Sequence, residues 1–136
     1  MRIDLNADVG EAATAEGRAT ELAVLAFVSS VNIACGAHAG DAETMRRTID
    51  GAAARALAIG AHPGYADRDG LGRRELILPP AAVTTLVLDQ IQLLASIASA
   101  SGFISSRAMF DGAASKGAKF GSSVKQSYIG VALASN

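Results

Sequence analysis

The sequence is poor in the residues that mark several classes of protein. Its 136 residues include no tryptophan, two tyrosines and four phenylalanines, which are too few aromatic side chains for a surface that stacks nucleic-acid bases. Lysine and arginine number 12 against 13 aspartate and glutamate residues, for a formal net charge of −1. No basic field is therefore available for an anionic polymer or membrane, and we expect neither nucleic acid nor membrane as a partner.

Cysteine is nearly absent as well. The single cysteine, Cys35, excludes an internal disulfide and fits a reducing compartment, so we expect a cytoplasmic protein. The first residues carry acidic side chains and lack an apolar segment, so we expect no signal peptide. Apolar runs are short and interrupted by polar residues, and we expect none to approach the roughly 20 residues of a membrane helix.

The apolar content that is present predicts one folded domain. Hydrophobic residues make up 50% of the chain, and the mean hydropathy is +0.29, as expected for a chain that buries a core. Short apolar segments predict strands over residues 3–7, 31–34 and 57–61. A fourth strand is expected to start at Phe103 and Ile104.

Helices are predicted between these strands from apolar residues at helical spacing. They are expected over residues 18–29, from near Asp41, and after Pro79 and Pro80. Strands that alternate with helices predict a parallel sheet with right-handed crossovers, either open or part of a barrel. From about Ser105 the periodicity ends, and we expect residues 105–136 to form a poorly ordered tail.

Polar side chains cluster directly after each of the first three predicted strands. Because parallel strands end at one edge of a sheet, we expect these groups to meet in one site. The three groups are Asn6, Asp8 and Glu11; Cys35, His38 and Asp41; and His62, Asp67, Arg73 and Arg74.

The two histidines of the chain both fall in these groups and allow two interpretations. In the first, the Asp8 carboxylate and the imidazoles of His38 and His62 together bind zinc or a similar divalent metal. Alternatively, both imidazoles only hydrogen-bond the loop backbone. Asp8 and Glu11 would act as a general acid and base if their pKa values were pushed apart.

The other polar residues also carry alternatives. Asp41 is predicted to cap a helix, to face the substrate, or to do both. Cys35 is predicted to be a small buried residue rather than a nucleophile. Arg73 and Arg74 either grip a carboxylate or phosphate of a ligand or form salt bridges with neighbouring aspartates. The nearby glycines match no nucleotide-binding motif.

Several longer motifs resemble the LamB/YcsF family, which supplies the A component of the bacterial 5-oxoprolinase. NIACGAHAGD and IGAHPGYADRDGLGRRE are the most specific, and DLNADVGE, MRRTID and DQIQLLA accompany them in order. The resemblance covers residues 1–104. It implies an α/β fold of parallel β/α repeats, part of a TIM-like barrel related to glycoside hydrolase and deacetylase folds.

The resemblance also implies a function. The family opens 5-oxo-L-proline to L-glutamate with ATP as co-substrate and with 5-oxoprolinase subunits B and C as partners. On this basis we assign Asp8, His38, Asp41 and His62 as catalytic residues. Asn6, Arg73 and Arg74 are assigned to the substrate. A metal-dependent amide or acetyl hydrolase and an inactive fragment are the alternatives.

Two departures from the family pattern accompany the resemblance. The segment EAATAEGRATE lacks the glycine-aromatic stretch that many relatives carry. Residues 104–111 read ISSRAMFD, in which the AMFD segment resembles the end of a family motif whose Lys-Pro-His portion is missing. A full barrel takes about 250 residues, so we expect an incomplete barrel over residues 1–136 and an inactive chain even with subunits B and C.

Overall fold

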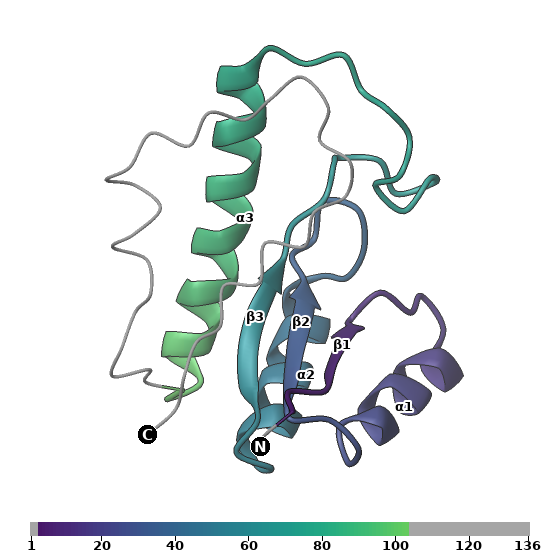
Figure 1. The fold of residues 1–136 in the computed structure, drawn as a ribbon, viewed down its shortest axis with the longest axis vertical. Helices are drawn as coiled ribbons and strands as arrows, with labels where there is room; N and C mark the ends of the chain where they lie inside the picture. Colours follow the sequence, from purple (N-terminus) through teal and green to yellow (C-terminus); the bar gives the residue numbers. More distant parts are fainter. Residues whose placement is uncertain (1–2, 104–136) are drawn as a thin grey trace.

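The computed structural model describes residues 3–103. Three strands, β1 (Asn6–Val9), β2 (Ser30–Ala34) and β3 (Ala58–His62), alternate with three helices, α1 (Ala15–Val24), α2 (Ala42–Ala53) and α3 (Pro80–Ala100) (Figure 1). The strands form one parallel sheet in the order β1-β2-β3. The predicted parallel α/β architecture is confirmed, although three strands do not close a barrel.

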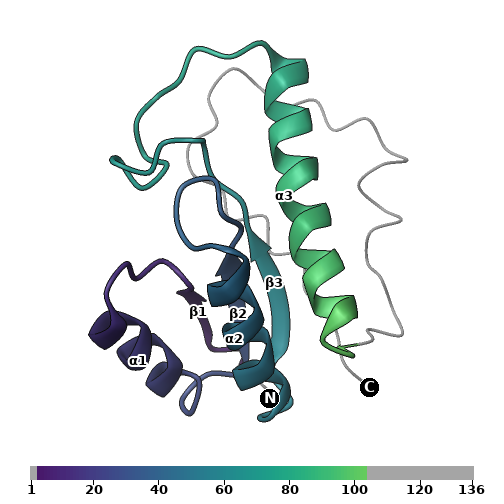
Figure 2. The same cartoon turned by 180° about the vertical axis from the view of Figure 1, so that it is seen from behind.

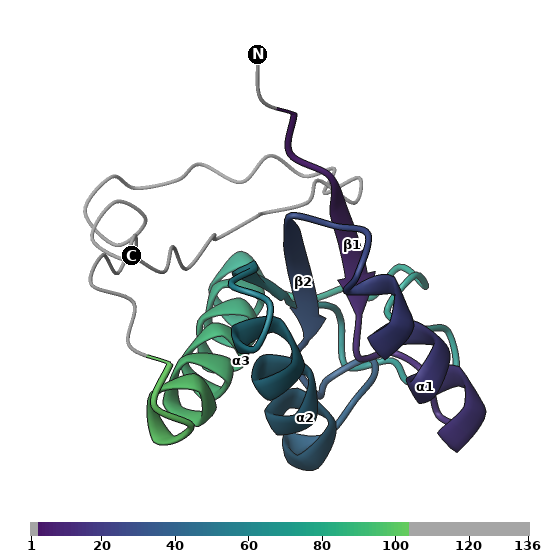
Figure 3. The same cartoon turned by 90° about the horizontal axis from the view of Figure 1, so that it is seen from below.

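All three helices lie on one side of this sheet. Helix α2 covers the middle of the sheet, in front of the strands in Figure 2, and α1 and α3 flank it at the two sides (Figure 3). The sheet face toward the helices carries Val9, Val31, Ile33 and Ile59, and each of these side chains is at most 1% exposed. With Ile49 and Leu94 from the helices they form the hydrophobic core.

The opposite face of the sheet is polar. Because side chains alternate along a strand, the register places Asn6 beside Ser30, Asp8 beside Asn32, and Asn32 beside Gly60 on that face. Within residues 3–103 no helix covers it (Figure 1). The polar face therefore extends along the sheet as far as the edge where the three strands end.

Element boundaries differ from the predicted ones mainly in the first unit. The strand predicted over residues 3–7 is β1 at Asn6–Val9, so Asn6 and Asp8 lie in the strand and not in the following loop. Helix α1 starts earlier than predicted because the Thr14 hydroxyl accepts a hydrogen bond from Gly17 N and caps it, and the helix ends earlier, at Val24. The prediction followed the most hydrophobic residues, whereas the strand occupies the segment in which polar and apolar residues alternate.

The later elements follow the prediction closely. Asp41 caps α2, as expected, and α3 begins at Pro80, where proline is tolerated because the first helical N–H has no partner. Phe103 is not part of a strand, so the fourth strand is not seen at that residue. Ile104 and the tail of residues 105–136 lie outside the described residues.

Helix α3 is longer and more apolar than the sequence analysis allowed. An 18-residue window of this 21-residue helix has a mean hydropathy of 1.5, so by length and composition the helix meets the requirement for crossing a membrane. The polar residues that interrupt its apolar runs are uncharged except Asp89, so the mean hydropathy of the helix stays high. This is weak evidence, because core helices of soluble proteins pass the same test; 22% of the window is buried among the described residues.

Candidate functional site

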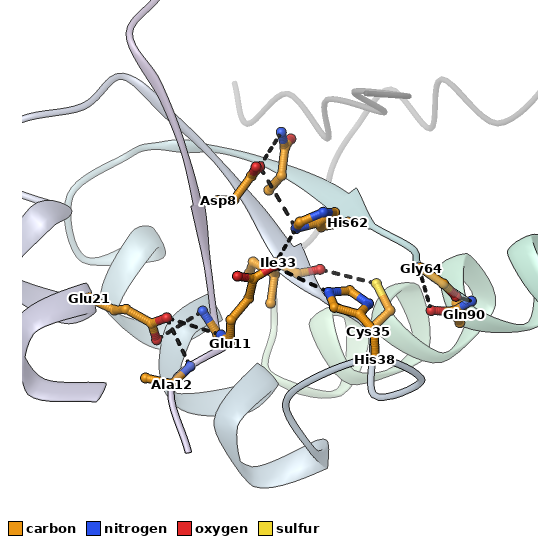
Figure 4. Close-up of polar contacts among 12 residues, drawn as sticks. Asp8, Glu11, Ala12, Glu21, Ile33, Cys35, His38, His62, Gly64 and Gln90 are labelled. Atoms are coloured by element: carbon orange, nitrogen blue, oxygen red, sulfur yellow. Dashed lines mark hydrogen bonds and ion pairs between the residues drawn. The ribbon is translucent and has the colours of Figure 1, made fainter. Parts of the chain in front are cut away.

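Three ionisable side chains meet where the strands end (Figure 4). Glu11 Oε1 lies 3.3 Å from His38 Nε2 and 3.4 Å from His62 Nδ1. The two imidazole rings are 4.9 Å apart between centroids and tilted by 57°. We call Glu11, His38 and His62 the acid–histidine cluster.

Each member of the cluster comes from a different strand end. Glu11 follows β1 after Gly10, His38 lies in the loop after β2, and His62 is the last residue of β3. Asp8 stands next to the cluster, with Oδ1 3.9 Å from His62 Nδ1. The prediction that Asp8, His38 and His62 converge on one side of a parallel sheet is confirmed.

The cluster is partly shielded from solvent. The His38 side chain is 2% exposed, and those of His62 and Glu11 are 16% and 26% exposed. Burial, together with the nearby His62, lowers the pKa of His38 against the opposing effect of Glu11. A lowered pKa keeps His38 neutral near pH 7, the form in which imidazole accepts a proton or binds a metal.

Glycines make room for the His38 ring. A Cβ atom on Gly64 would lie 2.3 Å from His38 Nδ1, and one on Gly72 would lie 2.9 Å from His38 Cβ. Nδ1 is buried and makes no hydrogen bond with any residue in 3–103. The glycine-rich loop after β3 thus determines where the ring stands, and Nε2 is the nitrogen turned toward Glu11.

The donor set of the cluster fits a divalent metal. One carboxylate oxygen and two imidazole nitrogens lie within 4.8 Å of one another. Bonds of about 2.0–2.1 Å in a tetrahedral site separate neighbouring ligand atoms by about 3.4 Å, close to both measured contacts of Glu11. The predicted set of Asp8, His38 and His62 differs in its carboxylate, because Asp8 sits within β1 and Glu11 reaches further past the strand end.

Asp8 and Asn6 belong to a network on the polar face of the sheet. The Asn32 side-chain amide donates to Asn6 Oδ1 at 2.9 Å and to Asp8 Oδ1 at 3.1 Å. Asn6 in turn donates to the Ser30 hydroxyl at 2.8 Å. Asn32 is buried in the middle strand, and the sequence analysis missed it because it lies inside an apolar run.

Asp41 and Cys35 have clear structural roles. The Asp41 carboxylate accepts a hydrogen bond from Thr44 N at 2.7 Å, and this bond lowers its pKa. Burial raises the pKa of the Cys35 thiol to about 11, and its sulfur donates to the Ile33 carbonyl. The expectation of a small buried residue at Cys35 is confirmed. A contact of Asp41 with substrate stays a prediction.

The two arginines after β3 are in different environments. Arg74 binds the Asp67 carboxylate, whose side chain is 3% exposed, and these hydrogen bonds lower the pKa of Asp67 to about 2. Arg73 is exposed, and no hydrogen bond or ion pair of its side chain occurs within residues 3–103. Arg74 therefore matches the salt-bridge alternative, whereas Arg73 is available to a ligand.

Two further residues support the cluster and were missed as site residues. The Gln90 side chain of α3 accepts a hydrogen bond from Gly64 N at 3.1 Å and donates to Gly64 O at 2.9 Å, which holds the loop that contacts His38. Glu21 of α1 accepts hydrogen bonds from the backbone amides at and beside Glu11. The signal for Gln90 was a polar residue on the buried stripe of α3, and the sequence offered no comparable signal for Glu21.

A parallel α/β fold with an acid–histidine cluster at the strand ends defines an enzyme-like class of protein. The LamB/YcsF family model matches residues 3–122, and the chain belongs to this family. It is similar to the lactam utilization protein from Thermus thermophilus, with 39% sequence identity and a TM-score of 0.66 over 75% of this chain. The chain spans 41% of the length of that relative.

Proposed function

We propose that this chain supplies catalytic groups to an enzyme that hydrolyses the amide bond of a small lactam. The acid–histidine cluster is the observation that carries the proposal, since it gathers a carboxylate and two imidazoles at the strand ends. Membership of the LamB/YcsF family and likeness to a lactam utilization protein support the lactam as substrate class.

The specific reaction we propose is the opening of 5-oxo-L-proline to L-glutamate, driven by ATP, with subunits B and C as partners in the cytoplasm. A lactam carbonyl is a poor electrophile. Transfer of the γ-phosphoryl group of ATP to its oxygen would convert that oxygen into a leaving group. Water then adds to the ring carbon, and the C–N bond breaks to give the amine and an acyl phosphate. A second water hydrolyses the acyl phosphate to the carboxylate and phosphate.

Residues of the cluster suit the proton transfers that this reaction needs. Neutral His38 takes a proton from the attacking water, and the more exposed His62 delivers one to the departing ring nitrogen. Glu11 contacts both rings and orients them. Asp8, 3.9 Å from His62, stabilises the imidazolium form of His62 that donates this proton. Exposed Arg73 is the cation that we assign to the substrate carboxylate, with Asn6 as a further polar contact.

A second candidate is a metal-dependent amide or acetyl hydrolase that needs no ATP. The cluster favours it, because one carboxylate oxygen and two imidazole nitrogens, the donor types of a zinc site, lie within 4.8 Å of one another. Glu11, His38 and His62 would hold the ion. When bound, the ion would polarise the substrate carbonyl and lower the pKa of a bound water.

One experiment separates these two reactions. Residues 3–103 would replace the corresponding segment of the Thermus thermophilus relative, and glutamate formed from 5-oxo-L-proline would be measured with subunits B and C. The expected result is ATP-dependent glutamate formation that falls at least about 100-fold in His62→Ala and is unchanged in Arg46→Ala, an exposed control. ATP-independent, chelator-sensitive hydrolysis would support the metal hydrolase. A folded chimera without either activity would contradict both.

A further inference from the structure

The carboxylate of Glu21 binds three consecutive backbone amides in the loop between β1 and α1. Its Oε2 accepts a hydrogen bond from Gly10 N at 3.1 Å, and its Oε1 accepts from Glu11 N at 3.1 Å and Ala12 N at 3.0 Å. Hydrogen bonds to an ionised acceptor are stronger than those between neutral groups. One side chain of α1 thus holds the backbone of the segment that carries Glu11 (Figure 4).

The same loop is held through its carbonyl groups. Arg18, one helical turn before Glu21, donates to Ala13 O at 2.7 Å and to Ala12 O at 3.4 Å. Gly10 has a φ of +83°, a left-handed conformation that glycine adopts without steric cost. The loop therefore depends on α1 for its shape, because it turns sharply and its amides bind a side chain rather than the sheet.

Helix α1 has an anchor of its own in the fold. A Cβ atom on Gly51 of α2 would lie 3.0 Å from Leu25 and 3.3 Å from Leu22. This close approach holds α1 and its C-terminal cap against α2. Leu22 directly follows Glu21, so packing of Leu22 also places the Glu21 carboxylate relative to the sheet.

We infer that Glu21 is a positioning residue that holds Glu11 at the distance where it contacts both histidines. Figure 4 shows Glu21 and the two histidines on opposite sides of Glu11. The Glu21 carboxylate binds backbone amides, so it acts on the cluster through the backbone of Glu11. The inference rests on the proposed function, because it assigns Glu21 a role in the site formed by Glu11, His38 and His62.

The alternative is that Glu21 only stabilises the loop. The position of the Glu11 carboxylate distinguishes the two roles. Its contacts with His38 and His62 are 3.3 and 3.4 Å, so a small displacement of Glu11 would change both. If Glu21 positions Glu11, both contacts change when Glu21 is altered. If it only stabilises the loop, protein stability changes while the cluster keeps its geometry.

The test uses the full 136-residue chain with Glu21→Gln and, as a matched control, Glu16→Gln, which removes the same charge from an exposed position of the same helix. Two quantities are measured at one fixed pH. The first is the imidazole nitrogen chemical shifts of His38 and His62 by NMR without metal. The second is the affinity for Zn²⁺ by competition with a chromophoric chelator.

In Glu21→Gln we expect changed imidazole shifts and Zn²⁺ binding weaker by about 10- to 100-fold, the usual effect of losing a group that orients a ligand. Glu16→Gln should match the wild type in both. Wild-type shifts and affinity in a folded Glu21→Gln protein would overturn the inference. Absence of Zn²⁺ binding by the wild type would count against the metal hydrolase alone, because the metal-free shifts still decide the role of Glu21.

A second variant covers the case in which Glu21→Gln does not fold. Glu21→Asp keeps the charge but shortens the side chain by one methylene group, so the carboxylate draws the loop toward α1 or loses part of its hydrogen bonding. Shifted imidazole signals in this folded variant would support the inference. Signals that match the wild type, with hydrogen exchange at Gly10, Glu11 and Ala12 accelerated, would reduce Glu21 to a stabiliser of the loop.

Discussion

His38 and Gly64 are in such close contact that a methyl group does not fit between them. A Cβ atom on Gly64 would stand 2.3 Å from His38 Nδ1, well inside van der Waals contact. The histidine comes from the loop after β2 and the glycine from the loop after β3. The placement of one cluster residue is therefore decided by a neighbouring loop.

Gly64→Ala should disturb the site more than the fold. The added methyl group must displace the His38 ring or the loop, and Zn²⁺ affinity should fall at least about tenfold. Gly102→Ala after α3 is the control, because a Cβ atom on Gly102 would meet no atom of residues 3–103 within 4 Å apart from its chain neighbours. Chelator competition measures both variants. Equal affinity in the two proteins would contradict a steric role for Gly64.

Gln90→Leu should destabilise the protein and loosen the loop after β3. The substitution leaves Gly64 N and Gly64 O without the side-chain amide that they bind at 3.1 and 2.9 Å, a cost of about 1–3 kcal/mol in the free energy of unfolding. Gln92→Leu, at an exposed position of the same helix, should change it by less than about 0.5 kcal/mol. Urea unfolding compares the two. Similar losses would show that the Gln90 hydrogen bonds contribute little.

Arg74→Ala should make the protein more sensitive to acid. Arg74 lowers the pKa of Asp67 from 3.8 to about 2, so this pair stabilises the fold above about pH 4, and the stabilisation is lost as the pH falls toward 2. Without Arg74 the pKa of Asp67 rises, and acid unfolding should begin at a higher pH. Circular dichroism against pH measures the midpoint, and Arg73→Ala serves as control. An unchanged midpoint in Arg74→Ala would argue against the salt bridge.

Asp41→Ala should lower the free energy of unfolding by about 1 kcal/mol, because the cap of α2 is lost. Asp41→Asn should retain nearly all of the stability, since asparagine caps helices about as well. Thermal unfolding measures both variants. The same pair tests the predicted catalytic role in the chimeric enzyme: a stable Asp41→Asn protein with at least about tenfold lower turnover would support that role, and unchanged turnover would leave Asp41 as a cap alone.

Much of the fold could be read from local sequence. Alternating apolar segments placed all three strands within a few residues, and Asp41 and Pro80 marked the starts of two helices correctly. These features depend on neighbours in the chain, which a sequence displays. The start of α1 was missed because the cap is Thr14, several residues before the first apolar residue of the helical pattern.

The sequence by itself determined that polar groups follow three consecutive strands, and parallel strands joined by right-handed crossovers must end at one edge. It therefore determined that Asp8, His38 and His62 would converge. Only the tertiary structure decided that Glu11 is the carboxylate between the histidines and that Arg74 is occupied by Asp67. Those choices depend on distances of a few ångströms between loops, which are set by strand register, by the turn at Gly10 and by packing against distant helices.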